Sequence, residues 1–248
     1  DGTYVENINF NGKAITLKSE NGPATTIIDG NQAGTVVTIN SGEGSDSVFE
    51  GFTVTNGSAS YDGGGIYCFG TSPILINNTI DSNDASHNGG GIYTYQGKAV
   101  IQGNQISDNY AGSSGGGICC YGTSQAVITL NTFSGNDATV SGGAIYGTFA
   151  SPTILNNTID ANSAGSSGGG ISCSSGIVTI RDNFVNGNVS QGGAGAIGLS
   201  DCSGEVSNNT ITSNSCTTRG GGISLGESSL LISQNTITGN TANTGGGI

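Results

Sequence analysis

The sequence predicts an all-β fold, a solenoid in which short parallel strands wind around one axis in about nine coils of about 26 residues. The leading observation is a phrase, Gly63-Gly64-Gly65-Ile66, that returns at a nearly fixed spacing. Its isoleucines mark the period, and they are Ile66, Ile92, Ile118, Ile145, Ile171, Ile197, Ile223 and Ile248. Two further observations are short bursts of alternating apolar residues and columns of like residues one period apart. A fixed period of about 20–50 residues is typical of repeat architectures.

Within one period, the apolar residues alternate in three short bursts and do not follow the 3.6-residue spacing of a helix. In the period that begins at Ile66, the first burst points Ile66 and Cys68 inward, and the second points Leu75 inward. Asn78 marks a corner, and the third burst points Ile80 inward. Three strands of 3–5 residues per period leave no room for crossover helices, which favours a solenoid of parallel strands.

Residues one period apart are alike at three further positions, which predicts columns of stacked side chains. An apolar column comprises Leu75, Ile101, Ile128, Ile154, Ile180, Val206 and Ile232. A second apolar column comprises Ile80, Ile106, Phe133, Ile159, Val185, Ile211 and Ile237. A column of small residues, where the wall bends, comprises Ala85, Ala111, Ala138, Ala164, Ser190, Cys216 and Ala242. Neighbours in a column are expected about 4.8 Å apart, the spacing of paired strands.

Two asparagine columns run beside the apolar ones. The first comprises Asn78, Asn104, Asn131, Asn157, Asn183, Asn209 and Asn235, and the second comprises Asn83, Asn109, Asn136, Asn162, Asn188, Asn214 and Asn240. An inward-turned amide can satisfy the backbone groups of a corner and bond to its copy one coil away, so we expect internal asparagine ladders. The alternative is a binding site or a set of glycan acceptors, because three stretches fit the N-glycosylation pattern: Asn77-Asn78-Thr79, Asn156-Asn157-Thr158 and Asn208-Asn209-Thr210.

The N-terminal residues are less regular but keep the same frame. Val54 stands one period before Ile80, and Ile28 stands one period earlier again. We interpret two pairs of apolar residues as earlier passes of the glycine-led strand, namely Val37/Ile39 and Ile15/Leu17. We therefore expect a single solenoid domain over residues 1–248, with less regular coils in 1–62 and regular repeats in 63–248. Residue 1 falls in a strand pattern, so we expect the chain to be a fragment of a longer one.

Composition and charge exclude several classes of partner. The 248 residues include 46 Gly and carry five Lys or Arg against seventeen Asp or Glu, a formal net charge of −12. Nucleic acid is not expected, because phosphate binding needs clustered Lys and Arg. The charge also disfavours anionic membranes and, unless a cation bridges, polyuronic acids. No apolar run approaches the roughly 20 residues needed to cross a bilayer. The Ser-, Thr-, Asn- and Gly-rich, Lys-poor composition suggests an extracellular or cell-surface protein.

Several stretches resemble a known family. They are Asp1-Gly2-Thr3-Tyr4-Val5-Glu6-Asn7-Ile8, Ile27-Ile28-Asp29-Gly30-Asn31, Glu50-Gly51-Phe52-Thr53-Val54-Thr55-Asn56-Gly57 and the Asn-Asn-Thr-Ile repeats. They are similar to the secreted bacterial repeat proteins among the right-handed parallel β-helix proteins of the pectin-lyase-like superfamily. Two others, Gly142-Gly143-Ala144-Ile145 and Phe133-Ser134-Gly135-Asn136, resemble repeats of polymorphic outer-membrane, autotransporter-type proteins. The resemblance implies the fold and leaves function open, because the superfamily includes polysaccharide lyases, glycoside hydrolases, binding proteins and adhesins.

No catalytic constellation stands out, and we predict no catalytic residue. The polygalacturonase pattern of paired aspartates, Gly-His-Gly and Arg-Ile-Lys is absent, and the only histidine, His87, is expected in a solvated loop. Hydrolysis by two carboxylates needs acids about 5–9.5 Å apart. Asp81 and Asp160 share an outward column three coils apart, which is about 14 Å. Arg181, beside Asp182 and with Asp160 expected on the neighbouring strand, is the one hint of a lyase base.

No cofactor is expected. The alternative is calcium held by loop carboxylates, and no spaced aspartate motif supports the three candidates, Asp62, Asp84 and Asp137.

Three of the cysteines are predicted not to form disulfides with one another. Cys68, Cys120 and Cys173 share an inward column at every second coil, so they are expected about 9.6 Å apart, beyond the ~7 Å limit for a disulfide. They are interpreted as small buried hydrophobic residues. Cys119 and Cys202 are expected to be more exposed and available for reaction or for pairing between chains.

Aromatic residues gather on one outward strand face. They are Tyr67, Phe69, Tyr93, Tyr95, Tyr121 and Tyr146. Regularly spaced rings can stack on sugars, and phenol hydroxyls can form hydrogen bonds with them. We predict a carbohydrate-binding face here, and the alternative is an external ladder of rings that stiffens the sheet.

A second outward face is partly apolar. It comprises Ile74, Ile76, Val100, Val127, Leu155 and Leu231. An exposed apolar strip usually marks an interaction site, so we expect an interface there.

Together these patterns predict a secreted or cell-surface structural protein that is not a catalyst. It would display a polysaccharide-binding or self-associating face, so its partners would be polysaccharide or other copies of itself. Two alternatives stay open. One is a polysaccharide lyase or glycoside hydrolase of the same superfamily, and the other is a filament or adhesin subunit.

Overall fold

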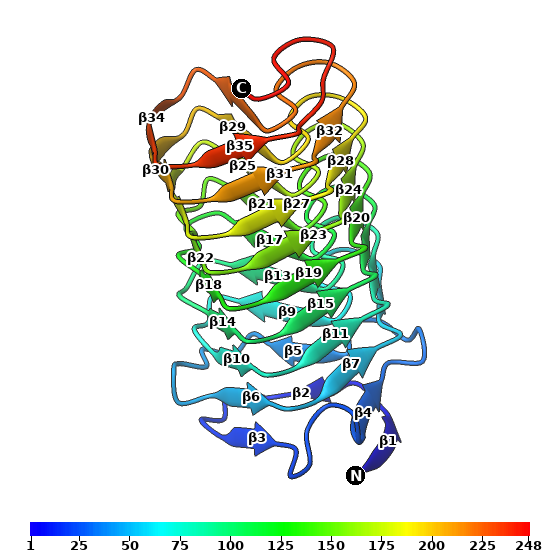
Figure 1. Cartoon of the computed structure of the whole chain (residues 1–248). Coiled ribbons are helices and arrows are strands. Elements are labelled where there is room, and N and C mark those ends of the chain that lie inside the picture. Colours follow the sequence, from blue (N-terminus) through cyan, green and yellow to red (C-terminus); the bar gives the residue numbers. More distant parts are fainter.

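The computed structural model describes residues 1–248 as 35 short strands without a helix, wound in coils that stack along one axis (Figure 1). The strands form four parallel sheets, and each strand pairs with the equivalent strand of the coil before and the coil after. The two chain termini lie at opposite ends of the stack (Figure 1). The predicted all-β solenoid is therefore confirmed. None of its segments is a helix that could span a membrane.

Sheets A and B form two opposite walls of the stack. Sheet A consists of β1 (Gly2–Val5), β4 (Thr26–Asp29), β7 (Thr53–Thr55), β11 (Thr79–Asp81), β15 (Gln105–Ser107), β19 (Thr132–Ser134), β23 (Thr158–Asp160), β27 (Phe184–Asn186), β31 (Thr210–Thr212) and β35 (Thr236–Thr238). Sheet B, which contains the glycine-led strands, consists of β2 (Ile8–Asn9), β5 (Val37–Ile39), β9 (Ile66–Phe69), β13 (Ile92–Tyr95), β17 (Ile118–Tyr121), β21 (Ile145–Thr148), β25 (Ile171–Ser174), β29 (Ile197–Ser200) and β33 (Ile223–Gly226).

Sheets C and D close the remaining sides. Sheet C consists of β3 (Thr16–Lys18), β6 (Val48–Glu50), β10 (Ile74–Ile76), β14 (Val100–Gln102), β18 (Val127–Thr129), β22 (Thr153–Leu155), β26 (Ile177–Arg181), β30 (Ser203–Ser207) and β34 (Ser229–Ser233). Sheet D consists of the two-residue strands β8 (Ser58–Ala59), β12 (Asp84–Ala85), β16 (Tyr110–Ala111), β20 (Asp137–Ala138), β24 (Ser163–Ala164), β28 (Val189–Ser190) and β32 (Ser215–Cys216).

Sheet D adds a fourth strand to the three that the sequence predicts for each coil. It follows the column of small residues, so that Ala85 pairs with Ala111 and Ala111 with Ala138. A strand of two residues is too short to show an alternating pattern, which is why the sequence indicates only a bend at this place.

The N-terminal coils depart from the predicted register. Val37 pairs with Ile66, as expected, but Leu17 pairs with Phe49 in sheet C. The interpretation of Ile15/Leu17 as a pass of the glycine-led strand is therefore wrong, and the earlier pass is β2, where Ile8 pairs with Val37. The reason is the length of this coil, because Ile8 and Val37 are 29 residues apart and the regular period is about 26. In a longer coil, the alternation of Ile15 and Leu17 does not show to which sheet their strand belongs.

The predicted interior columns stack in register. Leu75 pairs with Ile101 and Ile101 with Ile128, and all three side chains are fully buried. They belong to one hydrophobic cluster of 38 buried residues that fills the solenoid from Phe10 to Ile223. Each coil thus buries its apolar residues against the coils on either side.

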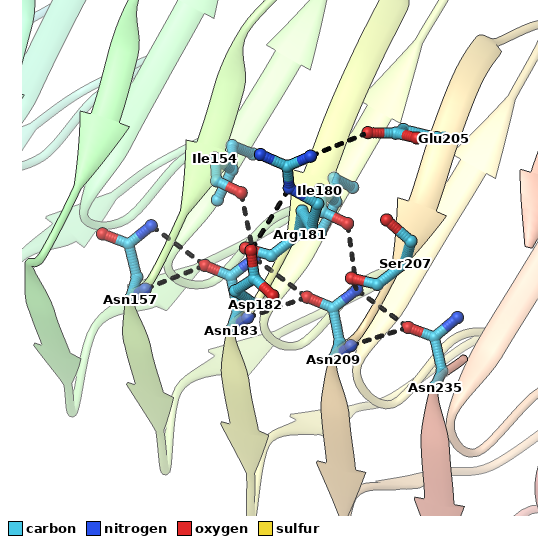
Figure 2. Close-up of polar contacts among 10 residues, drawn as sticks. All are labelled: Ile154, Asn157, Ile180, Arg181, Asp182, Asn183, Glu205, Ser207, Asn209 and Asn235. Carbon is cyan, nitrogen blue, oxygen red and sulfur yellow. Dashed lines mark hydrogen bonds and ion pairs between the residues drawn. The ribbon is translucent and has the colours of Figure 1, made fainter. Parts of the chain in front are cut away.

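Both asparagine columns form internal ladders, as predicted. Asn157 donates from its backbone N and from Nδ2 to Oδ1 of Asn183, at 2.9 and 3.0 Å, and Asn183 bonds Asn209 in the same way (Figure 2). Nδ2 of Asn183 also donates to the carbonyl of Ile154, at 2.9 Å. No buried side-chain nitrogen or oxygen lacks a hydrogen-bond partner. The ladders therefore satisfy the corners between sheets C, A and D.

Candidate functional site

The outward face of sheet B changes character along the axis. Each of its regular strands carries two outward side chains. The first outward column runs Tyr67, Tyr93, Cys119, Tyr146, Ser172, Gly198 and Ser224. The second runs Phe69, Tyr95, Tyr121, Thr148, Ser174, Ser200 and Gly226. Both columns begin with aromatic residues and continue with small, mostly hydroxylated ones.

Five of the six predicted aromatic residues form one cluster, the aromatic platform, which comprises Tyr67, Phe69, Tyr93, Tyr95 and Tyr121. The rings of Tyr67 and Tyr93 stack with centroids 5.5 Å apart and planes at 8°. Phe69 stacks on Tyr95 at 4.6 Å, and Tyr95 on Tyr121 at 5.9 Å. Neighbouring rings therefore cover one another's faces, as the external ladder would.

The platform residues differ in exposure. Phe69 is 45% exposed and Tyr121 is 37% exposed, whereas Tyr93 is only 6% exposed. Burial, and then the nearby charge of Asp62, raises the pKa of the Tyr93 phenol well above its usual range. Tyr121 has a ring on one side only, and its other side faces the next coil at Thr148. Tyr93 is thus a packing residue, and the outer contacts fall to Phe69 and Tyr121.

The glycine-led loop covers the first outward column. At Gly115, where φ is +73°, the chain turns back so tightly that a Cβ would lie 2.9 Å from Cβ of Cys119. Cys119 is fully buried beneath this turn, and Cys202 is 2% exposed. The expectation that these two cysteines are exposed is therefore wrong: the glycine-led loop covers the outward side of Cys119, and Cys202 packs in the hydrophobic core cluster. Burial raises the pKa of both thiols, which opposes reactivity.

A groove opens where the residues of the two outward columns become small. It has a volume of about 460 Å³, within the range of about 300–1,000 Å³ that is usual for ligand sites. Its floor contains Ser172, Gly198 and Ser224, and Tyr146 lines it beside them. The floor positions from Tyr146 to Ser224 span three coil steps, about 14 Å. Tyr146 thus lies apart from the platform and belongs to the groove.

The walls of the groove are rich in hydroxyl groups. The glycine-led loops contribute Ser141, Ser167, Thr218 and Arg219, and the second outward column contributes Ser174 and Ser200. The Ser174 hydroxyl donates to Oγ1 of Thr148 at 2.8 Å, and that of Ser200 donates to Asp201 at 3.2 Å. No carboxylate lines the groove. It is therefore a polar channel with one cationic side chain.

A second hollow adjoins the opposite end of the platform. It has a volume of about 360 Å³, and Tyr61, Asp62 and Tyr67 are among the residues that line it. Oδ1 of Asp62 accepts hydrogen bonds from the backbone N and Nδ2 of Asn88, each at 3.0 Å. The Tyr67 end of the platform thus borders a concave surface.

Arg181 lies on sheet C, away from the groove. Its guanidinium is 3.2 Å from Asp182 and 4.0 Å from Glu205 on the next strand (Figure 2). The expectation that Asp160 lies on the strand beside Arg181 is wrong: Leu155 pairs with Arg181, and Asp160 lies in sheet A. The corner at the asparagine ladder separates the two sheets, so a proton-abstracting group beside Asp160 does not arise.

The remaining acidic candidates and the histidine are dispersed. Asp81 and Asp160 are three coils apart, as expected. Asp84 and Asp137 are separated by Tyr110, and no group of three or more His, Cys, Asp or Glu side chains is placed to hold a metal ion. The imidazole of His87 stacks on the ring of Tyr61 at 4.9 Å. Calcium binding stays an untested alternative.

The apolar strip lies on the outward face of sheet C. Ile74, Val100 and Val127 are in register, and polar residues from Thr153 to Glu205 separate them from Leu231. Leu231 is 60% exposed, and the other five predicted residues are half-buried. The structure thus brings part of the strip together and places Leu155 and Leu231 apart from it. Its role as an interface stays a prediction.

The groove is the feature that the sequence analysis missed. Its lining combines two strand columns with residues of the glycine-led loops, among them Ser167 and Arg219. The signal was present in the replacement of tyrosine by Ser172 and Ser224 in the first outward column. What the sequence does not show is that the loops and the two strand columns together line one groove.

Comparison with known proteins agrees with this architecture. The model of the right-handed β-helix region family matches residues 2–145 and 77–197 of the chain. The chain therefore belongs to the right-handed parallel β-helix repeat proteins, consistent with the pectin-lyase-like superfamily. Neither the search of curated proteins nor the search of solved structures finds a match.

Proposed function

We propose that the protein is an extracellular or cell-surface β-helix that binds polysaccharide along the outward face of sheet B and performs no catalysis. The observation that carries this proposal is the continuity of that face. Tyr121 ends the aromatic platform, and Tyr146 in the next coil begins the hydroxyl-lined groove. A linear glycan laid along the axis would meet ring edges and phenol hydroxyls first, and serine hydroxyls next.

The chemistry of the face supports a carbohydrate ligand. Sugars present apolar C–H faces that pack on aromatic rings and hydroxyls that exchange hydrogen bonds with polar side chains. The free side of Tyr121 and the hollow beside Tyr67 offer ring surfaces, and the groove offers donors and acceptors in rows one coil apart. Rigid strands hold these groups in place, so little conformational entropy is lost on binding.

The non-catalytic part of the proposal follows from the distribution of titratable groups. The groove holds no carboxylate, histidine or lysine. The one arginine with carboxylate partners, Arg181, lies on sheet C, where Asp182 and Glu205 neutralise it. A lyase or hydrolase would need an acid or a base within reach of the bound sugar.

The test is glycan retention by a variant in which Phe69→Ser and Tyr121→Ser are combined. Serine suits this column, because Ser174 and Ser200 occupy it in later coils. We expect retention on a glycan array to fall on the order of tenfold. The thermal midpoint should fall only slightly, because both side chains are partly exposed and lose only their stacking on neighbouring platform rings. Tyr93 is avoided, because removing a buried ring would open a cavity and destabilise the coil.

The matched control is Phe149→Asn, which removes an aromatic side chain that is 62% exposed and lies outside the platform. Asparagine tolerates the positive φ of 50° at this position. Equal retention by the double variant and the control would contradict sugar binding at the platform. Release of shortened or unsaturated glycan during the assay would contradict the non-catalytic part.

A further inference from the structure

Building on the proposed glycan binding, we infer that the groove selects an otherwise neutral glycan that carries a single anionic substituent, a carboxylate or a sulfate ester, which Arg219 binds. The inference names the ligand chemistry of the groove between Tyr146 and Ser224. It rests on the groove's lining, on the absence of an ion pair at Arg219 and on the charge of the whole molecule.

Arg219 lines the groove without a carboxylate partner. The ion pairs within 4.0 Å involve Lys18 with Glu50 and Arg181 with Asp182 and Glu205, and none involves Arg219. The side chain is exposed, whereas its backbone is fixed by a β-bridge to Thr244. A guanidinium presents a rigid fork of N–H donors that matches a carboxylate or a sulfate through two parallel hydrogen bonds. The guanidinium of Arg219, which has no ion-pair partner, can therefore bind one carboxylate or sulfate at the wall of the groove.

The rest of the lining is neutral and suits sugar hydroxyls. Ser172, Ser174 and Ser224 contribute hydroxyls along the groove, and Tyr146 contributes a phenol. Asp201 and Glu227 follow the wall residues Ser200 and Gly226 directly, but they occupy turns beyond the groove and do not line it. The groove therefore offers one anion-binding group and a series of neutral hydrogen-bonding groups.

The charge of the molecule sets the upper limit on the ligand's charge. With seventeen acidic residues against five basic ones, the surface repels a polyanion, and a single guanidinium can neutralise only one substituent. A glycan with an acid on every sugar would place its remaining charges opposite neutral hydroxyls, in the field of a molecule of net charge −12. The groove should therefore discriminate against polyuronates as well as against fully neutral chains.

The experiment is binding of the full chain to an array on which neutral oligosaccharides are printed beside their own monosulfated and monocarboxylated forms and beside polyuronates. We expect the monoanionic member of a pair to bind about tenfold tighter than its neutral parent, and polyuronates to bind no better than the parent. The monosulfated and monocarboxylated oligosaccharides show which of the two groups the site binds. The preference should weaken as ionic strength rises.

Two variants assign the preference to Arg219. Arg219→Gln should abolish the preference, so that the neutral and anionic members of a pair bind with equal affinity, and Arg219→Lys should keep part of it. The matched control is Arg181→Gln, which removes the ion-paired arginine of sheet C and should leave the ratio unaltered. The platform variant Phe69→Ser with Tyr121→Ser should weaken both members of each pair equally.

The outcomes separate this inference from the proposed function. Binding of neutral and monoanionic glycans with equal affinity, or a preference that survives Arg219→Gln, overturns the inference and leaves glycan binding intact. Strongest binding to polyuronates also overturns it. A chain that retains no glycan on any spot overturns the proposed function and the inference with it.

Discussion

An asparagine of the internal ladders carries five hydrogen bonds on one short side chain and its backbone N–H. For Asn157 these are two donated to Oδ1 of Asn183, one donated to the carbonyl of Ile128, and two accepted from Asn131. All of these groups are buried, so each bond replaces water that cannot reach the corner. The ladder therefore supplies hydrogen bonds to buried backbone groups that the bend would otherwise leave without partners.

Replacing Asn157 by alanine should lower the free energy of unfolding by about 3 kcal/mol. The carbonyl of Ile128 and the backbone N–H of Asn131 would lose their partners, and an unsatisfied buried group costs about 1–3 kcal/mol. Urea denaturation followed by circular dichroism would measure the change.

The control is the preceding residue, Asn156→Gly, at an exposed corner position with φ of 53°. Glycine accepts this conformation without strain, so stability should change little. A loss for Asn157→Ala no larger than that of the control would mean that the ladder bonds add nothing beyond what water provides.

At the scale of the strand, the inward column of sheet B alternates cysteine with other small residues. Cys68, Thr94, Cys120, Gly147 and Cys173 follow one another in successive coils. All six cysteines of the chain are free. Burial, followed by the charge of Glu43, raises the pKa of Cys68 from its usual 9.0 to about 12, and burial raises that of Cys120 to about 11. The column is therefore neutral near pH 7 and packs as an apolar one.

The raised pKa values predict that the protein loses stability in alkaline solution. The folded state keeps its thiol protons when the unfolded chain gives them up, so the stabilisation is complete below about pH 9 and declines as pH rises toward 11 for Cys120 and 12 for Cys68. Each thiol should contribute a slope of about 1.4 kcal/mol per pH unit within its window. Urea midpoints between pH 8 and pH 10.5 would measure the decline.

The double variant Cys68→Ala with Cys120→Ala separates the thiols from the tyrosines and lysines that titrate in the same range. It should be less stable at pH 7, because it loses buried volume. Its alkaline slope should nevertheless be shallower than that of the parent chain. An unchanged slope would assign the alkaline loss to other groups.

Prediction from sequence succeeds for strand columns because a parallel pairing repeats them at every coil. Leu75 and Asn78 were placed correctly since their copies recur one period later, and strand register follows from the apolar pattern. The fourth strand at Asp84–Ala85 was missed because two residues carry no alternation. The burial of Cys119 and the groove beside Arg219 were missed because they depend on how loops fold against a face. The glycine-led loops repeat with the coils, but the strand pattern does not show which side chains they cover.

For the whole molecule, the coils behave as interchangeable layers. Contacts link each strand to the strands of the adjoining coils, so stability is approximately a sum over coils and the interfaces between them. The core has no centre at which a change would disrupt all parts together. Loss of one complete layer should therefore be tolerated.

Deletion of residues 144–169 removes one 26-residue period and joins Gly143 to Gly170. Asn131 then meets Asn183 at the ladder spacing, so the shortened chain should fold with a similar circular dichroism spectrum. Its length in small-angle X-ray scattering should decrease by about 5 Å.

Deletion of residues 144–156 removes only half of this period and serves as the control. It brings a strand of sheet A under one of sheet B and leaves ladder asparagines unpartnered. This chain should aggregate or fold poorly. Equal folding of both deletions would contradict a structure made of layers.

The hydrogen bonds of the asparagine ladders also give the solenoid a direction along its axis. From Asn78 to Asn209, each side-chain amide of the first ladder donates to the asparagine of the coil that follows it in the chain, and none donates the opposite way to a ladder oxygen. If one coil were inserted in the reverse orientation, two amide oxygens would face each other at one of its interfaces. Two amide donors would face each other at the other interface. A hybrid solenoid assembled from the coils of two such proteins must therefore keep the same amino-to-carboxyl direction in every coil.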